Sequence, residues 1–325
     1  MMNRSTFLKL LAAAPLAGTA PLLRAQAYPA RPVRLVVPFA AGGTTDIVAR
    51  AVAERLHKEL GQPVLVDNRG GAGGALGASE IAKAAPDGYT IGMATVSTTA
   101  TNPAINPKIP YDPLKDFTPI INIAATPNVI AVHPSFPARD YAAFIAEVKA
   151  RPGRHSYGTA GNGSIGHLQM ELFKSLAGLY ITHIPYKGSG PALNDAVAGT
   201  VPIVFDNLPS ALPFIKDGRL VPVVVSAPAR LPQLPAVPTF QEVGLAPANR
   251  MAYYGLHGPK GLPRDVVQTL HEATRKALED AGLRARIEAT GSMIVGNTPE
   301  QFARQIAAEL EVYRRTVAAQ KLALD

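Results

Sequence analysis

Two short glycine-rich segments contain the residues of this chain whose types and spacing best suit chemistry. The first is Gly42-Gly43-Thr44-Thr45-Asp46, and the second, more than a hundred residues later, is Gly161-Asn162-Gly163-Ser164-Ile165-Gly166. Each follows a strand-like run and precedes a helical pattern. Such a bend presents backbone N–H groups at the positive end of a helix, where an anion binds well. The repetition predicts two lobes that face one ligand.

The side chains around these bends favour a small carboxylate over a polyphosphate. No Lys or Arg lies between Pro38 and Thr45, or between Gly158 and Gly166. A bound anion would therefore depend on N–H groups, hydroxyls and water, whereas polyphosphates usually recruit Lys, Arg or a metal. His167 follows the second bend directly. Asp46 lies in the first helical turn, where it complements the helix dipole and could also orient its bend.

Three further positions are candidates, each with a plain structural alternative. Lys187 lies in a turn, Tyr186-Lys187-Gly188-Ser189-Gly190, and is either a counter-charge or part of a surface loop. Asp206 ends a strand and either accepts a hydrogen bond from a ligand amino or hydroxyl group or caps the next helix. Ser97 follows the third strand and either faces the cleft or is an ordinary polar strand end.

Two enzymatic interpretations compete with binding. Gly161, Gly163 and Gly166 fit the dinucleotide fingerprint, but the next strand ends at Tyr186-Lys187 without the acid that holds a ribose. Asn162-Gly163-Ser164-Ile165-Gly166 nearly matches a hydrolase nucleophile elbow, with Asn in place of the first Gly. His167 or His183, with Asp206, would complete its triad. We expect Ser164 instead to cap a helix or to bind a ligand.

Composition excludes several other classes. The chain has 325 residues, enough for two domains, and a formal net charge of +8. Its basic residues are scattered and often adjoin acids, which argues against nucleic acid as a partner. The absence of Cys excludes disulfides and thiol catalysis. The His residues lack the spacing of a zinc site, so we expect no metal and no cofactor.

The first 27 residues resemble a signal peptide. Arg4 and Lys9 give a positive start, an interrupted apolar stretch follows, and Ala25-Gln26-Ala27 is a small-x-small cleavage site. The stretch is too short and too interrupted for a bilayer-spanning helix. We expect cleavage after Ala27 and export to the periplasm.

Strand and helix patterns alternate and position both bends. The run 35–39 reads as a buried strand, 46–60 as a helix that Thr44 or Thr45 caps and Gly61 ends, and 64–66 and 89–95 as further strands. The scheme recurs from strand 156–159 and helix 165–176 to strand 221–225. Two helices, 265–281 and 299–319, finish the chain. Consecutive βαβ units predict parallel sheets covered by helices.

Taken together, the residues resemble the solute receptors of tripartite tricarboxylate transporters, also called the Bug family, over the whole chain from Tyr28. The marks in the first half are Val36-Val37-Pro38-Phe39-x-x-Gly42-Gly43-x-x-Asp46, Asn68-Arg69-x-Gly71-Ala72-Gly73-Gly74, Ala85-Pro86-Asp87-Gly88-Tyr89-Thr90 and Tyr111-Asp112-Pro113-x-Lys115-Asp116-Phe117. The second half adds Pro185-Tyr186-Lys187-Gly188 and Leu234-Pro235-x-Val237-Pro238-Thr239.

The resemblance implies an α/β, type II periplasmic binding protein with two Rossmann-like lobes. Lobe 1 would comprise residues 28–127 plus 247–325, and lobe 2 residues 128–246. The implied function is capture of a small organic acid and its delivery to membrane permease subunits, by a non-enzymatic monomer. A soluble sensor input remains an alternative. The residues that the resemblance and the motifs assign to the ligand are Phe39, Ala40, Gly42, Gly43, Thr44, Asp46, Ser97, Thr159, Gly161, Gly163, Ser164, His167, Lys187 and Asp206.

Overall fold

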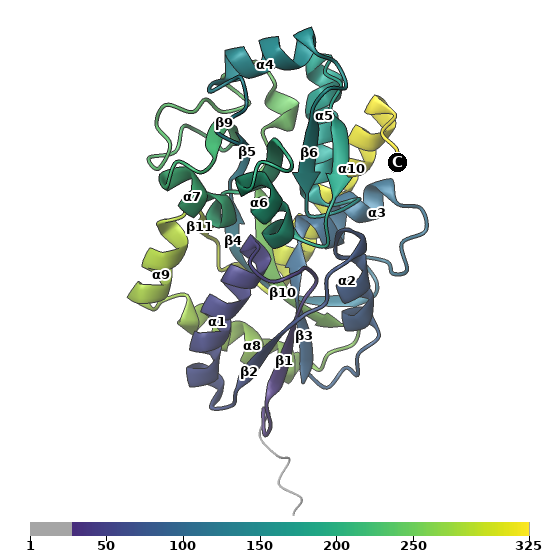
Figure 1. Ribbon diagram of the computed structural model, residues 1–325. Helices are drawn as coiled ribbons and strands as arrows, with labels where there is room; N and C mark the ends of the chain where they lie inside the picture. Colours follow the sequence, from purple (N-terminus) through teal and green to yellow (C-terminus); the bar gives the residue numbers. More distant parts are fainter. Residues whose placement is uncertain (1–27, 325) are drawn as a thin grey trace, which may run out of the picture.

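The chain forms two β-sheets, each flanked by helices, which define two lobes. The computed structural model describes residues 28–324, so the predicted signal peptide lies outside the described residues. The first sheet has the order β11-β4-β10-β3-β1-β2 (Figure 1). Its strands are β1 (Val33–Val37), β2 (Val64–Asn68), β3 (Thr90–Thr95), β4 (Phe117–Thr126), β10 (Ala252–Pro259) and β11 (Met293–Ile294).

The second sheet has the order β7-β6-β8-β5-β9. Its strands are β5 (Asn128–Val132), β6 (Ser156–Thr159), β7 (Thr182–Pro185), β8 (Ile203–Asn207) and β9 (Val221–Ser226). The α/β fold class is confirmed. The exact lobe boundaries stay a prediction, although the strand membership of each sheet is compatible with them.

Both sheets are mixed, so the prediction of purely parallel sheets was wrong. β1 pairs in parallel with β2 and β3, but β10 runs antiparallel to β3 and β4. Likewise β5 runs antiparallel to β8 and β9. The cause is the chain path. β5 and β10 each enter their sheet directly from the other lobe and therefore run away from the junction, whereas their neighbours run toward it.

Most of the helices agree with the sequence pattern. They are α1 (Thr44–Leu60), α2 (Ala75–Ala82), α3 (Asn102–Ile105), α4 (Tyr141–Ala150), α5 (Ile165–Ala177), α6 (Ser189–Val197), α7 (Leu208–Lys216), α8 (Arg264–Ala277), α9 (Ala281–Glu288) and α10 (Pro299–Gln320). The predicted helix 265–281 ends early, because Asp280 caps a separate helix, α9, by accepting a hydrogen bond from the Leu283 N–H. β4, β10 and α4 were not predicted.

Helix α1 shows how local sequence builds the first bend. Val48, Val52 and Leu56 bury one face, and Gly61 ends the helix in the left-handed region at φ 67°. Its N-cap is Gly43, not Thr44 or Thr45 as predicted, and no side chain caps it. The Thr44 hydroxyl instead bonds to Ser210 in the other lobe, 2.8 Å away. A tertiary contact has taken the group that a local cap would have used.

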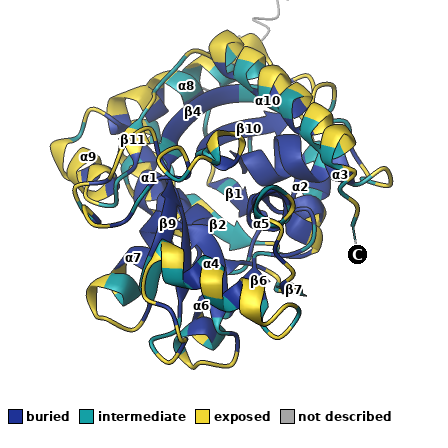
Figure 2. Cartoon of the chain, turned by 90° about the horizontal axis from the view of Figure 1, so that it is seen from above, coloured by how far each residue is buried: buried dark blue, intermediate teal, exposed yellow. Residues whose placement is uncertain are grey.

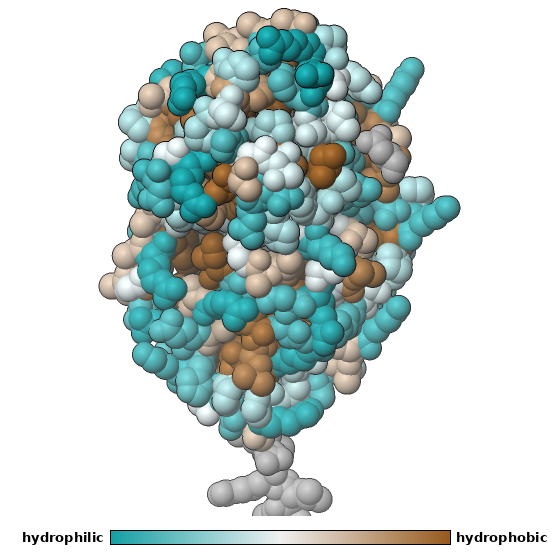
Figure 3. Space-filling view, in the orientation of Figure 1, coloured by the Kyte–Doolittle hydropathy of each residue, from teal (hydrophilic) through white to brown (hydrophobic). Residues whose placement is uncertain are grey.

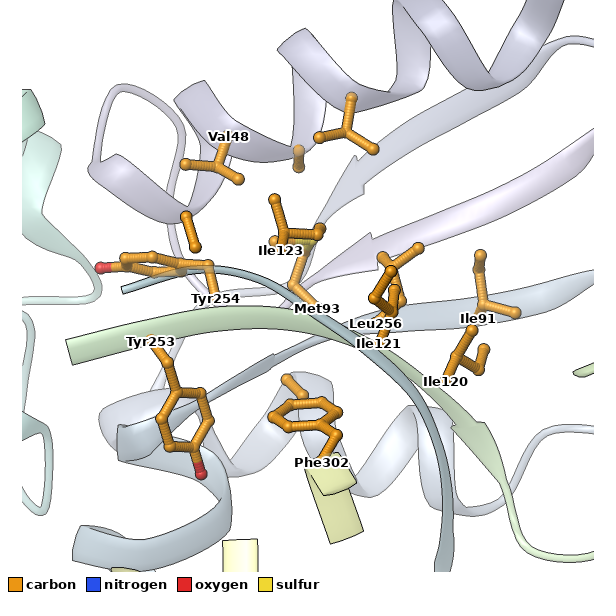
Figure 4. Close-up of a cluster of buried hydrophobic side chains, with 14 of the residues drawn as sticks. Val48, Ile91, Met93, Ile120, Ile121, Ile123, Tyr253, Tyr254, Leu256 and Phe302 are labelled. Atoms are coloured by element: carbon orange, nitrogen blue, oxygen red, sulfur yellow. The ribbon is translucent and has the colours of Figure 1, made fainter. Parts of the chain in front are cut away.

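The largest core lies in lobe 1, where α1, α8 and α10 cover the sheet (Figures 1 and 4). Tyr253 and Tyr254 point to opposite faces of β10 (Figure 4), as alternation along a strand requires. Tyr253 packs edge-on against Phe302 of α10, with ring centroids 5.5 Å apart. The central strands of both sheets are buried, the edge strands β2, β7 and β11 are partly exposed, and the outer faces of the helices are exposed (Figure 2).

The surface in Figure 3 is mainly hydrophilic, with small, separate hydrophobic areas. The exposed large apolar side chains are correspondingly scattered over different elements, among them Leu65 on β2, Leu76 on α2 and Tyr180 after α5. Within residues 28–324, no helix has the length and apolar character needed to cross a bilayer. Nor do the described His, Asp and Glu residues gather in a group that would hold a metal ion.

Candidate ligand-binding site

A small cavity lies where the two lobes meet. The centre of a water molecule can reach only about 20 Å³ of it, which is room for about one water molecule. The two lobes are therefore closed on each other. Both lobes line it, lobe 1 through α1, β3 and β10 and lobe 2 through α5, α6 and β8. The lining residues are Phe39, Gly43, Thr45, Thr95, Val96, Ser97, Ala160, Ile165, Gly166, Ser189, Phe205, Asp206, Asn207, Ala252, Tyr253 and Tyr254.

Asp46 holds the first bend in shape. Its carboxylate accepts hydrogen bonds from the Gly42 N–H at 3.1 Å and from the Asn68 side chain at 3.0 Å, and it pairs with Arg50 at 3.0 Å. Burial disfavours its charge, but the bonds from Arg50, Gly42 and Asn68 outweigh burial, and the pKa of Asp46 is below its ordinary value. Asp46 thus orients the bend, while its pair with Arg50, one helical turn on, holds its carboxylate in place.

Side-chain hydrogen bonds hold the second bend in the same way. The Ser164 hydroxyl caps α5 by accepting from the His167 N–H at 3.3 Å, as the sequence predicted. His167 Nδ1 accepts from the Gly163 N–H at 3.2 Å, and the Thr159 hydroxyl accepts from the Gly161 N–H at 3.2 Å. Ser164 and His167 are both fully buried. They therefore serve the loop conformation, which is not the arrangement of a hydrolase nucleophile and its base.

His183 supports this bend from behind. Its Nε2 lies 2.6 Å from the Thr159 hydroxyl, and its ring stacks on His167 with centroids 4.2 Å apart. Burial, helped by the neighbouring His167 and Lys174, lowers the pKa of His183 to about 3. The His183 imidazole is therefore neutral at physiological pH, and it contributes a hydrogen bond to the bend instead of a positive charge.

Hydrogen bonds cross the cleft on both sides of the cavity. The Ile165 N–H donates to Ser97 Oγ at 3.0 Å, and the Thr101 hydroxyl donates to the Gly163 carbonyl at 2.8 Å. On the other side the Ala40 N–H donates to the Lys187 carbonyl at 3.1 Å. These bonds exist only when the lobes are together, so they stabilise the closed state.

Glycines permit the two lobes to approach this closely. A Cβ on Gly190 would lie 2.2 Å from the Ala41 carbonyl oxygen, and a Cβ on Gly73 would lie 2.1 Å from that of Asn162. Both distances are far below van der Waals contact. The glycine-rich bends therefore have two roles, because they present N–H groups and they leave room for the facing loop.

One carboxylate lies at the lobe 2 side of the cavity. Asp206, at the end of β8, is 4% exposed and accepts hydrogen bonds from the Ser189 hydroxyl at 2.5 Å and the Ser210 hydroxyl at 2.6 Å. Burial raises the pKa of Asp206 to about 6, and the two serine bonds only partly offset that effect. Next to it, the Tyr254 hydroxyl donates to Asn207 Oδ1 across the lobes at 2.5 Å.

Most of the predicted residues lie around this cavity. Some of them line it, and others lie beside it and hold the two bends in their conformation. Phe39, Gly43, Ser97 and Asp206 are in the lining, whereas the following residues adjoin it within the two bends: Ala40, Gly42, Thr44, Asp46, Thr159, Gly161, Gly163, Ser164 and His167. Lys187 is exposed and does not line the cavity. Its backbone carbonyl, not its ammonium group, contributes to the closed site. Contact of any of these residues with a ligand stays a prediction.

Sequence reasoning missed part of the lining. Tyr253, Tyr254 and Ala252 lie on β10, which was not predicted as a strand. The sequence predicts only a turn at Ser189, whereas in the structure its hydroxyl donates to Asp206. The paired tyrosines between Met251 and Gly255 were the available signal, since tyrosine combines a large apolar ring with a polar hydroxyl and is enriched at interfaces.

The chain is similar to a known protein family and to curated proteins. The family model described as "Tripartite tricarboxylate transporter family receptor" matches residues 48–322. Among curated proteins, protein BugT of Bordetella pertussis is 37% identical over 91% of this chain and 91% of its own length.

Solved structures share the fold and the sequence pattern. A structure described as a periplasmic transporter has a TM-score of 0.90 and 49% identity, covering 92% of this chain and all of its own. Rpa4515 of R. palustris with adipate has a TM-score of 0.87 and 36% identity, covering 91% of this chain and 99% of its own. MatC from Rhodopseudomonas palustris with bound malate has a TM-score of 0.86 and 34% identity, covering 89% of this chain and all of its own.

Proposed function

This chain belongs to the tripartite tricarboxylate transporter receptor family, and on that premise we propose that it captures a small organic carboxylate between its lobes and delivers it to a membrane transporter of that class. The observation that carries the proposal is the cavity between the lobes. The N-terminal turns of α1 and α5 meet there, and the lining contains hydroxyls and aromatic rings but no Lys, Arg or His.

Backbone groups are proposed to hold the carboxylate. The first N–H groups of a helix have no partner inside it, and those of Thr44 and Thr45 on α1 and Gly166 on α5 lie at or beside the cavity. Closure excludes water and lowers the local dielectric constant, which strengthens such bonds. Relatives with bound adipate and malate support a carboxylate as the ligand class.

A binding screen tests the capture step. We test mono-, di- and tricarboxylates, acidic amino acids and aromatic acids, and we expect some of them to raise the Tm of the protein. A ligand at a hundredfold excess over its Kd stabilises the folded state by about 2.7 kcal/mol. Isothermal titration on the same acids measures their affinity. If neutral or cationic compounds raise the Tm and no acid does, the proposed function fails.

Delivery requires a separate experiment. We propose that the receptor is exported, that cleavage after Ala27 leaves Tyr28 as the first residue, and that permease subunits accept the loaded form. Spheroplasts of a strain lacking this protein should regain uptake of the labelled acid when purified protein is added. N-terminal sequencing of the periplasmic fraction checks the cleavage site. Equal uptake with and without the protein would argue for the sensor alternative.

A further inference from the structure

Asp206 is the one carboxylate among the residues lining the cavity, and it faces no cation there. Its two oxygens accept hydrogen bonds from Ser189 and Ser210 at 2.5 and 2.6 Å, and the other titratable groups of the lining are the hydroxyls of Tyr253 and Tyr254. A carboxylate has about four lone-pair sites. The two serine hydroxyls and the Asn207 backbone N–H use three of these sites, so the carboxylate retains acceptor capacity for a ligand donor.

The surroundings of Asp206 keep a positive charge away from every side. The contact elements are β8 itself, α6 with Ser189, α7 with Ser210, the N-terminus of α1 with Thr44, and β10 with Tyr254. The nearest acid on α1, Asp46, is already paired with Arg50. Lys187, just before α6, is exposed, and its side chain is not in the lining.

This arrangement disfavours a second negative charge on the ligand. Two carboxylates brought together in a site that excludes water repel strongly, unless one of them is protonated. A hydroxyl or ammonium group at the same place would instead donate to Asp206, and a donor to a buried charged acceptor contributes strongly to binding.

From this geometry we propose, resting on the proposed function, that Asp206 is the specificity-determining residue of the site and selects a carboxylate whose far end is an uncharged or cationic hydrogen-bond donor. The bends hold the carboxylate of the ligand, and Asp206 accepts from a hydroxyl or ammonium group at its other end. A diacid enters with its far carboxyl group protonated, or with Asp206 protonated.

Acids that differ only at the far end test this directly. For chains of four carbons these are butyrate, 4-hydroxybutyrate, 4-aminobutyrate and succinate, with the matching sets of five and six carbons to cover the ligand length. At about pH 7.5 we expect the best hydroxy or amino acid to bind about tenfold or more tighter than the unsubstituted acid and the diacid of its own length. The hydroxy and amino arms show which donor the site prefers.

Asp206→Asn is the decisive variant, and Asp195→Asn is its matched control, because Asp195 is a half-buried carboxylate on α6 that bonds to Tyr186 and does not line the cavity. In Asp206→Asn we expect the amino acid to lose about tenfold in affinity and the diacid to gain. Because burial raises the pKa of Asp206 to about 6, lowering the pH from about 7.5 to about 5 should strengthen diacid binding in the wild type and not in Asp206→Asn. If Asp206→Asn does not fold, the wild-type pH series decides alone.

The outcomes separate the two proposals. If diacids bind as tightly as amino and hydroxy acids at about pH 7.5, or if Asp206→Asn leaves the order of affinities unchanged, the role of Asp206 is overturned while carboxylate capture stands. If no carboxylate of any length binds at either pH, both proposals are overturned.

Discussion

At the scale of single residues, His257 is an unusual group to find in a core. It lies on β10 with its ring stacked on Phe117, centroids 4.4 Å apart, and among the described residues neither ring nitrogen has a hydrogen-bond partner. Burial lowers the pKa of His257 to about 3. The folded state therefore holds this side chain neutral at a pH where the unfolded chain would protonate it.

The sign of the resulting pH dependence follows from proton linkage. Below about pH 6.5 the unfolded state binds more protons at this site than the folded state, so the contribution of His257 to stability is lost as the pH falls toward 3. When the pH is lowered from about 7.5 to about 5, we expect the free energy of unfolding of His257→Phe to increase by about 2 kcal/mol relative to that of the wild type. Urea unfolding at both values measures it.

His57 provides the control for that measurement, because it is exposed on α1. His57→Gln, measured in the same way, removes an exposed imidazole instead of a buried one. Parallel curves for His257→Phe and the wild type would show that the ring is not held neutral.

Thr44 couples the two lobes through hydrogen bonds to Ser210. Its hydroxyl lies 2.8 Å from Ser210 Oγ and accepts from the Ser210 N–H at 3.2 Å. Thr44→Val keeps the shape and leaves a buried N–H unpaired in the closed state, which costs about 1–3 kcal/mol. We expect ligand affinity, measured by titration calorimetry, to fall about tenfold.

Thr118→Val is the matched control, since the Thr118 hydroxyl donates to Pro259 within lobe 1 at 2.9 Å. It should change stability at most and leave the affinity near that of the wild type. An equal loss in both variants would mean that the effect of Thr44 is not an effect on closure.

At the scale of elements, α10 begins with a complete capping box. The Thr298 hydroxyl accepts from the Gln301 N–H, and the Gln301 side chain accepts from the Thr298 N–H at 2.9 Å. Since the cap is worth about 1 kcal/mol, Thr298→Ala should lower the free energy of unfolding by about that amount in urea. Thr269→Ala, inside α8, removes a hydroxyl bonded to its own helix and should cost clearly less. If the two variants lose the same stability, the box contributes nothing beyond an ordinary hydroxyl.

At the scale of the whole molecule, the closed state depends on glycines that face the other lobe. Gly190 lies in the first turn of α6, where Ala is a better helix former, yet its Cβ would meet the Ala41 carbonyl at 2.2 Å. Gly190→Ala should therefore leave lobe 2 intact and hold the lobes apart. We expect a larger radius of gyration in X-ray scattering with saturating ligand, and an affinity loss of at least about tenfold.

Gly282→Ala is the control for that experiment. It adds the same methyl group to a helix, α9, where the nearest atoms belong to the side chains of Asp280 and Arg55. This variant should close like the wild type. Full closure and affinity in Gly190→Ala would contradict the role assigned to these glycines.

Much of the fold and part of the site follow from the sequence, because their signals are local. Helical periodicity placed α1, α5 and α10 within a few residues, and the glycines of both bends marked where strands turn into helices. β4 and β10 escaped prediction because their direction and pairing depend on strands far away in the chain.

By itself, the sequence determined the two bends, the absence of Lys and Arg beside them, and the family pattern that connects them to carboxylate receptors. Only the tertiary structure decided which polar groups meet. It directed the Thr44 hydroxyl to Ser210 instead of its own helix, left the Lys187 ammonium outside, and buried Asp206 beside Tyr254. The reason is physical: burial and hydrogen-bond partners are properties of the packed lobes, and closure creates them from segments that local sequence cannot relate to one another.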